Sequence, residues 1–166
     1  MRHRSIFITF IFLAGFAAIA GQRAGHAGEA QDEAGKVYRE AHKLILDEKF
    51  PAAIQALETF LQKYSSSDWS DDARFWMCFA REKTEPSAEK AFNCYQKFIQ
   101  SNPKSKWIND AKMNMVQIAH QLAKEGKPHY EQQVRSFAAK GEGEIEMAVF
   151  AALLDIGDEG ALARVM

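Results

Sequence analysis

The chain has 166 residues, of which 47% are hydrophobic and 26% are charged, and its formal net charge is −1. This length allows one domain with a substantial core, and the composition is too apolar for an intrinsically disordered chain. The nearly balanced charge, without any long basic run, gives no electrostatic reason to expect a nucleic-acid-binding protein.

The first segment has the features of a secretory signal peptide. Arg2 and Arg4 precede an apolar run over residues 6–20, and small residues follow it. The run is shorter than the ~18–20 apolar residues that span a membrane. We therefore expect residues 1–27 to be removed during export, with cleavage after Ala20 as the alternative. Removal takes away three arginines and no acids, so the mature chain would carry a net charge of −4.

An internal repeat follows a segment, residues 28–33, that we expect to be a flexible N-terminus. Residues 53–73 align without a gap with residues 91–111, and seven of the 21 positions are identical. The identical pairs are Ala53/Ala91, Phe60/Phe98, Gln62/Gln100, Ser67/Ser105, Trp69/Trp107, Asp72/Asp110 and Ala73/Ala111. We call the constant sequence separation within these pairs the repeat offset. Such self-similarity is typical of proteins built from stacked structural units.

Apolar residues within the repeats recur at the three- and four-residue spacing of amphipathic helices. The expected helices are centred on residues 37–45, 53–64, 76–80, 91–99, 115–123 and 130–138. Ser67 and Ser105 stand where an N-cap is wanted, and the Asp71–Asp72 and Asn109–Asp110 pairs lie in the first turns that follow. The sequence therefore predicts an all-α fold of antiparallel helix pairs, the third pair being the least regular.

The last segment, residues 141–166, has a different pattern. Residues 145–156 are apolar on nearly all sides of a helix, which indicates burial on more than one side. Gly157–Asp158 would end that helix, and a short one is expected over residues 161–166. This pair resembles the opening of a HEAT-type repeat, so it is either the start of a longer array or a docking segment.

Residues 34–140 resemble tetratricopeptide repeats. The first unit has the small and aromatic residues of that pattern at Ala41, Phe50, Ala53, Leu57 and Phe60, and the second has Ala91, Tyr95, Phe98 and Asn102–Pro103. The junction NPKSKWINDA, residues 102–111, is similar to that of bacterial envelope proteins of this class, including the BamD-like assembly factors and the Tol-Pal coordinator. The resemblance implies a right-handed solenoid of helix pairs, with a HEAT-like pair at the C-terminus.

No constellation of catalytic, metal-binding or cofactor-binding residues is recognisable in the sequence. His42, His120 and His129 are isolated from other ligand residues, which favours ordinary surface histidines. The Asp71–Asp72 and Glu142/Glu144 pairs favour capping and solvated charge over acid–base catalysis. We therefore expect a protein that is not an enzyme and needs no cofactor.

Two residue types recur at the same position of both units. Trp69 and Trp107 could form a sugar-binding platform, but their repetition favours packing at the junctions between units. Met77 and Met115 either fill gaps in the core or line a soft binding face, and we expect at least one of them in the core.

Cys78 and Cys94 lie on either side of the turn near Glu85. In an antiparallel helix pair they would be roughly level, which is compatible with a disulfide bond. The alternative is two small buried thiols.

These features, together with the resemblance, predict a non-catalytic scaffold that binds a protein or peptide partner in the periplasm or outside the cell. The C-terminal residues 145–166 are candidates for self-association. A second hypothesis makes the chain the docking segment of a larger envelope protein whose activity lies beyond residue 166. The sequence does not identify the residues that bind the partner.

Overall fold

The computed structural model describes residues 19–138, 145, 147–149 and 151. All regular secondary structure in these residues is helical, as the apolar periodicity predicts. The helices are α1 (Ile19–Leu46), α2 (Phe50–Lys63), α3 (Ser70–Thr84), α4 (Ala88–Ser101), α5 (Ile108–Lys124) and α6 (His129–Ala138). The apolar run of the expected signal peptide lies almost wholly outside the described residues.

The helix boundaries reproduce the repeat offset of the sequence. Helices α2 and α4 have the same length, and both their first and their last residues are separated by that offset. The same offset separates the first residues of α3 and α5. Pro51 lies in the first turn of α2, where its missing N–H costs no helical hydrogen bond.

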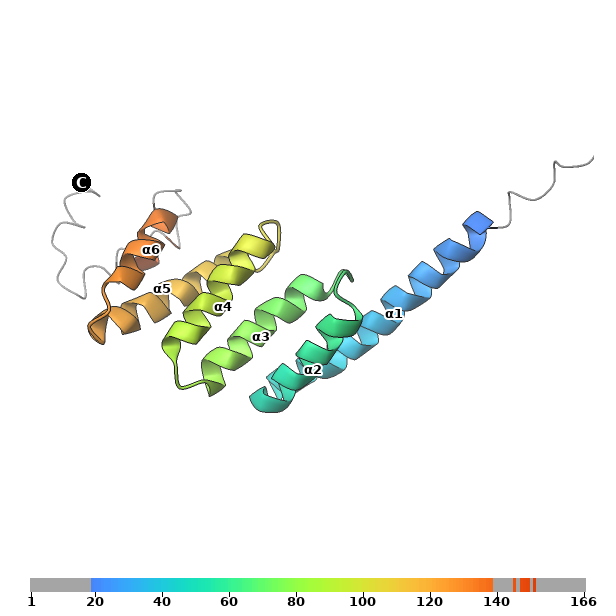
Figure 1. Cartoon of the computed structure of the whole chain (residues 1–166), viewed down its shortest axis with the longest axis horizontal. Coiled ribbons are helices and arrows are strands. Elements are labelled where there is room, and N and C mark those ends of the chain that lie inside the picture. Colours follow the sequence, from blue (N-terminus) through green and yellow to red (C-terminus); the bar gives the residue numbers. More distant parts are fainter. Residues whose placement is uncertain (1–18, 139–144, 146, 150, 152–166) are drawn as a thin grey trace, which may run out of the picture.

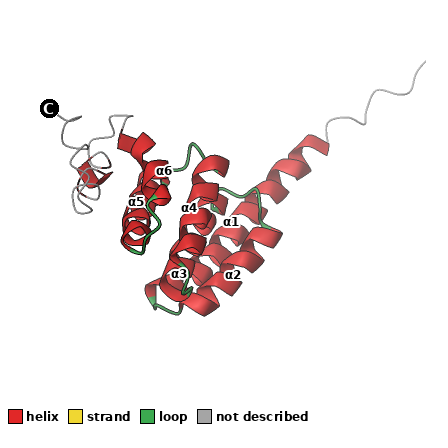
Figure 2. Ribbon diagram, turned by 60° about the vertical axis from the view of Figure 1, so that its left-hand side comes forward, coloured by secondary structure: helices red, strands yellow, loops and turns green. Residues whose placement is uncertain are grey.

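Each helix packs against the next one along the chain, so the six helices lie side by side in an elongated row (Figure 1). Helix α3 also contacts α1, so the second pair rests on both helices of the first. Figure 2 shows the helices with their short connecting loops in a second view. The connection after α5 turns at Gly126, whose φ of +86° favours glycine.

Among the described residues, the buried side chains form two core clusters. One joins α1, α2 and α3, and the other continues from α3 through α4, α5 and α6. Leu57, Phe60, Phe92 and Tyr95 are among the largest fully buried side chains. Phe98 is buried, whereas its neighbour Lys97 is exposed, which agrees with the predicted helical phase.

Two local expectations differ from the structure. Helix α1 runs without a break through residues 28–33, which we expected to be a flexible N-terminus. Glutamate, alanine and glutamine, which are good helix formers, occupy most of these positions. Ser67 and Ser105 are not N-caps, because α3 and α5 begin three residues later, after Trp69 and Trp107.

Those serines instead form the turns that precede α3 and α5. The Ser70 N–H donates to the Ser67 carbonyl at 3.0 Å, and the Ile108 N–H donates to the Ser105 carbonyl at 3.3 Å. This extra turn displaces both helix starts by the same number of residues. The junction therefore repeats in structure as well as in sequence.

Few residues of the C-terminal segment lie within the described part of the chain. Ile145 and Val149 are buried in the cluster that contains α4, α5 and α6, whereas Met147 is 67% exposed. These positions agree with a helix that has one face against the core. Residues 152–166, and with them the predicted final helix, lie outside the described residues.

Candidate binding surfaces

The two repeated tryptophans hold the junctions between helix pairs. The Trp69 ring stacks on Tyr38 of α1, with ring centroids 5.0 Å apart. The Trp107 ring stacks on Phe75 of α3, with centroids 4.6 Å apart and planes only 6° from parallel. Each ring therefore packs against the first helix of the preceding pair, as predicted for a junction between units, and neither serves as an open platform for sugars.

A buried carboxylate reinforces the second junction. Asp72 is only 5% exposed, and its Oδ1 accepts a hydrogen bond from Trp107 Nε1 at 2.8 Å. Lys106 Nζ lies 2.7 Å from the same oxygen. Asp72 lies in the first turn of α3, as predicted, but the expectation of a solvated charge was wrong. The Trp107 indole and Lys106 together compensate for its burial.

His42 of α1 lies against this junction rather than on the open surface. Its ring is 4.8 Å from the Trp76 ring and 5.7 Å from the Tyr38 ring. Burial disfavours the imidazolium and lowers the pKa of His42, while the charge of Asp72 acts in the opposite direction. Burial, together with the charge of Asp72, also raises the pKa of the Tyr38 phenol. His42 is therefore half-buried and packed against aromatic rings, unlike the surface histidine expected from the sequence.

A series of side-chain hydrogen bonds connects α3, α4 and α5. The Tyr95 hydroxyl on α4 donates to Glu82 Oε2 on α3 at 2.8 Å, and Asn114 Nδ2 on α5 donates to the Tyr95 oxygen at 2.8 Å. Burial is the main reason why the pKa of Tyr95 is raised. A buried hydroxyl with both a donor and an acceptor partner fixes the relative position of these helices.

A groove of about 620 Å³ opens between α3 and α4, with α2 as its outer wall; we name it the cationic groove. Four of its lining side chains are cationic, Arg74, Arg81, Lys90 and Lys97, whereas Glu85 is the one lining carboxylate. Apolar and sulfur-containing side chains also line it, namely Leu61, Met77, Cys78, Cys94 and Phe98. This surface is locally basic on a chain whose net charge is slightly negative.

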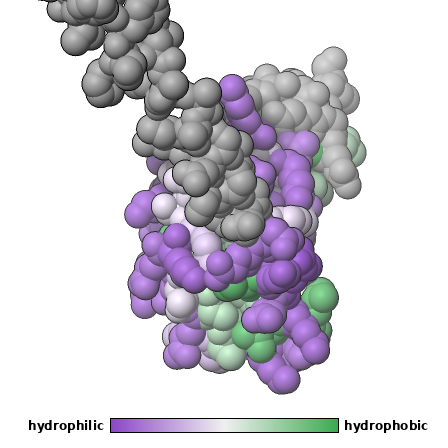
Figure 3. Space-filling view, turned by 90° about the vertical axis from the view of Figure 1, so that its right-hand side faces the viewer, coloured by the Kyte–Doolittle hydropathy of each residue, from purple (hydrophilic) through white to green (hydrophobic). Residues whose placement is uncertain are grey.

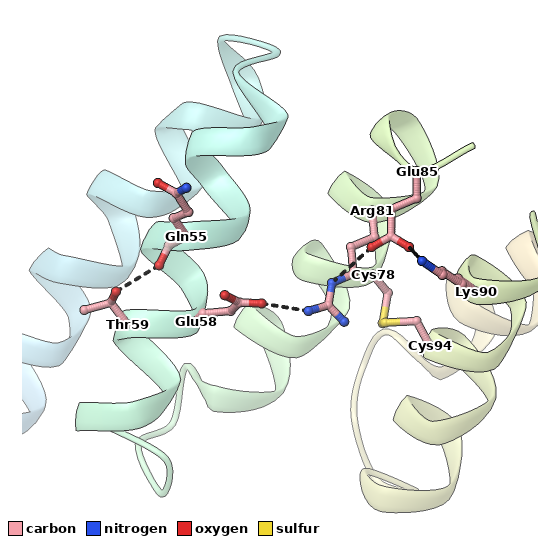
Figure 4. A network of polar contacts seen from close by, with 8 residues as sticks. All are labelled: Gln55, Glu58, Thr59, Cys78, Arg81, Glu85, Lys90 and Cys94. Atoms are coloured by element: carbon pink, nitrogen blue, oxygen red, sulfur yellow. Dashed lines mark hydrogen bonds and ion pairs between the residues drawn. A yellow bond between two sulfur atoms is a disulfide. The ribbon is translucent and has the colours of Figure 1, made fainter. Parts of the chain in front are cut away.

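The carboxylates near the cationic groove neutralise only part of its positive charge. Arg81 pairs with Glu58 of α2 at 2.7 Å and lies 3.8 Å from Glu85, which also approaches Lys90 at 3.9 Å (Figure 4). Arg74 donates to the neutral Asn102 Oδ1 and to a backbone carbonyl. Lys97 is exposed, and neither it nor Arg74 has a carboxylate partner among the described residues.

A disulfide bond joins the two helices that form the cationic groove. Cys78 of α3 and Cys94 of α4 are bonded, with Cα atoms 5.5 Å apart (Figure 4). The sequence left two possibilities for these cysteines, and the structure shows the bridge. Because both residues line the cationic groove, the bond fixes its width.

A second groove, of about 570 Å³, lies between α1 and α2 on the side of α2 that faces away from α3; we name it the neutral groove. Its lining is mainly apolar or uncharged: Val37, Ala41, Leu44, Ala52, Gln55, Ala56 and Thr59, with Glu40 as the charged member. Figure 3 views this end of the molecule and shows a hydrophobic area bordered by hydrophilic side chains. In Figure 4, Gln55 and Thr59 lie on the side of α2 opposite to Glu58.

The two grooves occupy equivalent places in successive helix pairs. Five lining positions correspond at the repeat offset: Glu40/Cys78, Ala52/Lys90, Gln55/Asn93, Ala56/Cys94 and Thr59/Lys97. The second pair therefore has a disulfide and two lysines where the first pair has mainly small or uncharged residues. This comparison of the aligned units could have identified the groove residues from the sequence, but only once the outward face of each helix was known.

The other residues singled out in the sequence have varied locations. Met115 is buried in the core, and Met77 lines the cationic groove. His129 is exposed and packs on the Tyr130 ring at 4.2 Å, and His120 lies 4.0 Å from Glu131. Glu142 and Glu144 lie outside the described residues.

The described residues contain no group of three or more histidine, cysteine, aspartate or glutamate side chains placed to hold a metal ion. Within the same part of the chain, no helix combines the length and the apolar character needed to cross a bilayer.

Comparison with known proteins finds no match to this chain among family models, curated proteins or solved structures.

Proposed function

We propose that this chain is a non-catalytic protein-binding scaffold of the bacterial cell envelope, built from stacked helix pairs like those of tetratricopeptide proteins. The observation that carries the proposal is the recurrence of one groove in two successive pairs, at the same repeat offset as the helix boundaries. Stacked repeats commonly present such continuous surfaces to extended peptides or to helices of a partner. The right-handed solenoid and the HEAT-like C-terminal pair are part of this proposal.

The chemistry of the described surfaces supports binding rather than catalysis. Apart from one glutamate in each, the grooves are lined by apolar, amide, hydroxyl and cationic side chains. Asp72, the aspartate with the closest partners, is engaged in a junction. The disulfide supports residence in an oxidising compartment such as the periplasm, because structural disulfides persist there. The basic, apolar and small-residue order of residues 1–27 supports export.

The binding function is tested by affinity capture from an envelope extract with the purified chain as bait. A scaffold should retain a discrete envelope protein in near-stoichiometric amount, and the complex should re-form from the two purified components. Failure to retain any envelope protein above the level of an unrelated helical bait would contradict the proposal.

Export is tested separately by sequencing the N-terminus of the chain recovered from its native compartment. We expect the mature protein to begin at Gly28. Recovery of the intact chain only from the cytoplasm would contradict the proposed location.

A further inference from the structure

We propose that the cationic groove between α3 and α4 binds an acidic peptide segment that carries at least one apolar side chain. This inference rests on the proposed scaffold function and names the chemistry of the partner. It follows from three properties of the groove: its excess of positive charge, its apolar floor and its fixed width.

The excess of positive charge in the groove favours an anionic partner. Its lining has four cations and one carboxylate, and the additional Glu58 pairs with Arg81 from the wall formed by α2. Arg74 and Lys97 have no carboxylate partner within the described part of the chain. Cations gathered around a concave surface attract and orient an acidic ligand more strongly than the same charges dispersed over the protein.

The apolar floor distinguishes a peptide from a simple anion. Leu61, Met77 and Phe98 line the groove together with the Cys78–Cys94 bridge, so an aliphatic or aromatic side chain can be buried between the flanking cations. Methionine and sulfur-rich surfaces adapt well to different apolar side chains. A segment with acidic residues on both sides of an apolar one matches this arrangement.

The neutral groove provides an internal comparison. At the positions of Lys90 and Lys97 it has Ala52 and Thr59, and at the positions of the disulfide it has Glu40 and Ala56. The backbone setting is equivalent, while the charge is not. An acidic segment should therefore select the second helix pair over the first.

The test is fluorescence anisotropy with the purified chain and a labelled peptide of sequence Glu-Glu-Leu-Glu-Glu-Leu-Glu-Glu. Matched peptides contain glutamine or lysine in place of glutamate. We expect saturable binding of the acidic peptide only, and weakening as salt is added, because salt screens exposed charges. Equal binding of all three peptides, or of a thymidine oligonucleotide at the same affinity, would overturn the proposal.

Charge reversal locates the site. The double variant Lys90→Glu/Lys97→Glu should weaken peptide binding by about tenfold or more. Lys43→Glu, an exposed position on α1 outside the lining of both grooves, should leave the affinity within about twofold of the parent. Because the double variant places negative charge beside Glu85, Arg74→Gln serves as a second, milder variant, and circular dichroism confirms its fold. The peptide does not bind in the cationic groove if both groove variants keep the affinity of the parent. The same conclusion follows if Lys43→Glu weakens peptide binding as much as they do.

Analytical ultracentrifugation, which measures self-association, tests the alternative that the groove binds a second copy of this chain instead of an acidic peptide. If Lys90→Glu/Lys97→Glu abolishes self-association while the acidic peptide fails to bind, the groove holds another copy and the proposal is wrong. Retention of the same envelope protein by the double variant would also overturn the groove proposal but leave the scaffold function standing. Peptide binding by a parent chain that retains no envelope protein would support the groove and contradict the scaffold function.

Discussion

The Trp107 indole donates a 2.8 Å hydrogen bond to Asp72, which joins the start of α5 to the first turn of α3. Asp72 is 5% exposed, whereas Asp110, its equivalent in the following repeat, is exposed. The two aspartates have the same place in the sequence unit but different surroundings, because a following tryptophan and lysine cover only the first. This pair provides a matched test of how the junction is stabilised.

We predict that Asp72→Ala lowers the free energy of unfolding by about 1.5–3 kcal/mol, the range for hydrogen bonds that involve a charged group. Asp110→Ala should lower it by less than about 0.5 kcal/mol, as is usual for exposed positions. Urea denaturation followed by circular dichroism measures both values. Equal effects would mean that the indole contact does not stabilise the junction.

The disulfide should contribute to stability as well as to groove shape. Cys78 and Cys94 are 16 residues apart in the sequence, and closing a loop of this length in the unfolded chain is worth about 3 kcal/mol in the chain-entropy description. The variant Cys78→Ala/Cys94→Ala should therefore unfold at lower denaturant concentration than the oxidised parent. Adding a reductant should destabilise the parent and leave the double variant unchanged; the opposite pattern would contradict the prediction.

His42 predicts a pH dependence of stability with a defined sign. Its pKa in the folded chain is lowered by burial, so below its ordinary pKa of about 6.5 the unfolded chain binds more protons than the folded one. Stability should fall as the pH is lowered from about 7 towards 5. His42→Gln should reduce this slope in thermal unfolding, whereas His129→Gln, on the exposed surface of α6, should keep it. An unchanged slope in His42→Gln would show that other groups cause it.

Deletion of residues 142–166 tests whether the stability of the array is local. The deletion removes Ile145 and Val149 from the cluster around α5 and α6. The amide hydrogens of the third pair should therefore exchange faster with solvent. The first two pairs should remain folded, because stacked repeats depend mainly on their neighbours. Hydrogen exchange resolved along the chain makes the measurement. Loss of protection in α1 and α2 would indicate one cooperative core, and the repeat account would then be too simple.

Much of the helical organisation could be predicted from the sequence, because the apolar spacing and the repeat offset depend on the chain alone. The phase of α4, with Phe98 inward and Lys97 outward, is one example. The true starts of α3 and α5 could not be placed in the same way. Ser67 and Ser105 have the chemistry of N-caps. The extra turn is favoured by the packing of Trp69 and Trp107 and, before α5, by a hydrogen bond from the Trp107 N–H to the Ser105 hydroxyl.

The grooves were harder to foresee than the core. Lys90 and Lys97 look like ordinary exposed residues of an amphipathic helix, and Arg74 looks like a solvated residue near the start of α3. Their convergence depends on how α3 and α4 pack and on the bridge between Cys78 and Cys94. The burial of Asp72 likewise depends on a tryptophan 35 positions away in the chain.

Site-specific photocrosslinking in intact cells is the most direct test of the account in which the scaffold binds its envelope partner through the cationic groove. A photoreactive side chain in place of Asn93, which is exposed in the cationic groove, is compared with one in place of Asn109, which is exposed at the start of α5. The account predicts one discrete protein adduct in the envelope fraction from position 93 and none from position 109. The absence of an adduct at position 93, or the same adduct at both positions, would contradict it.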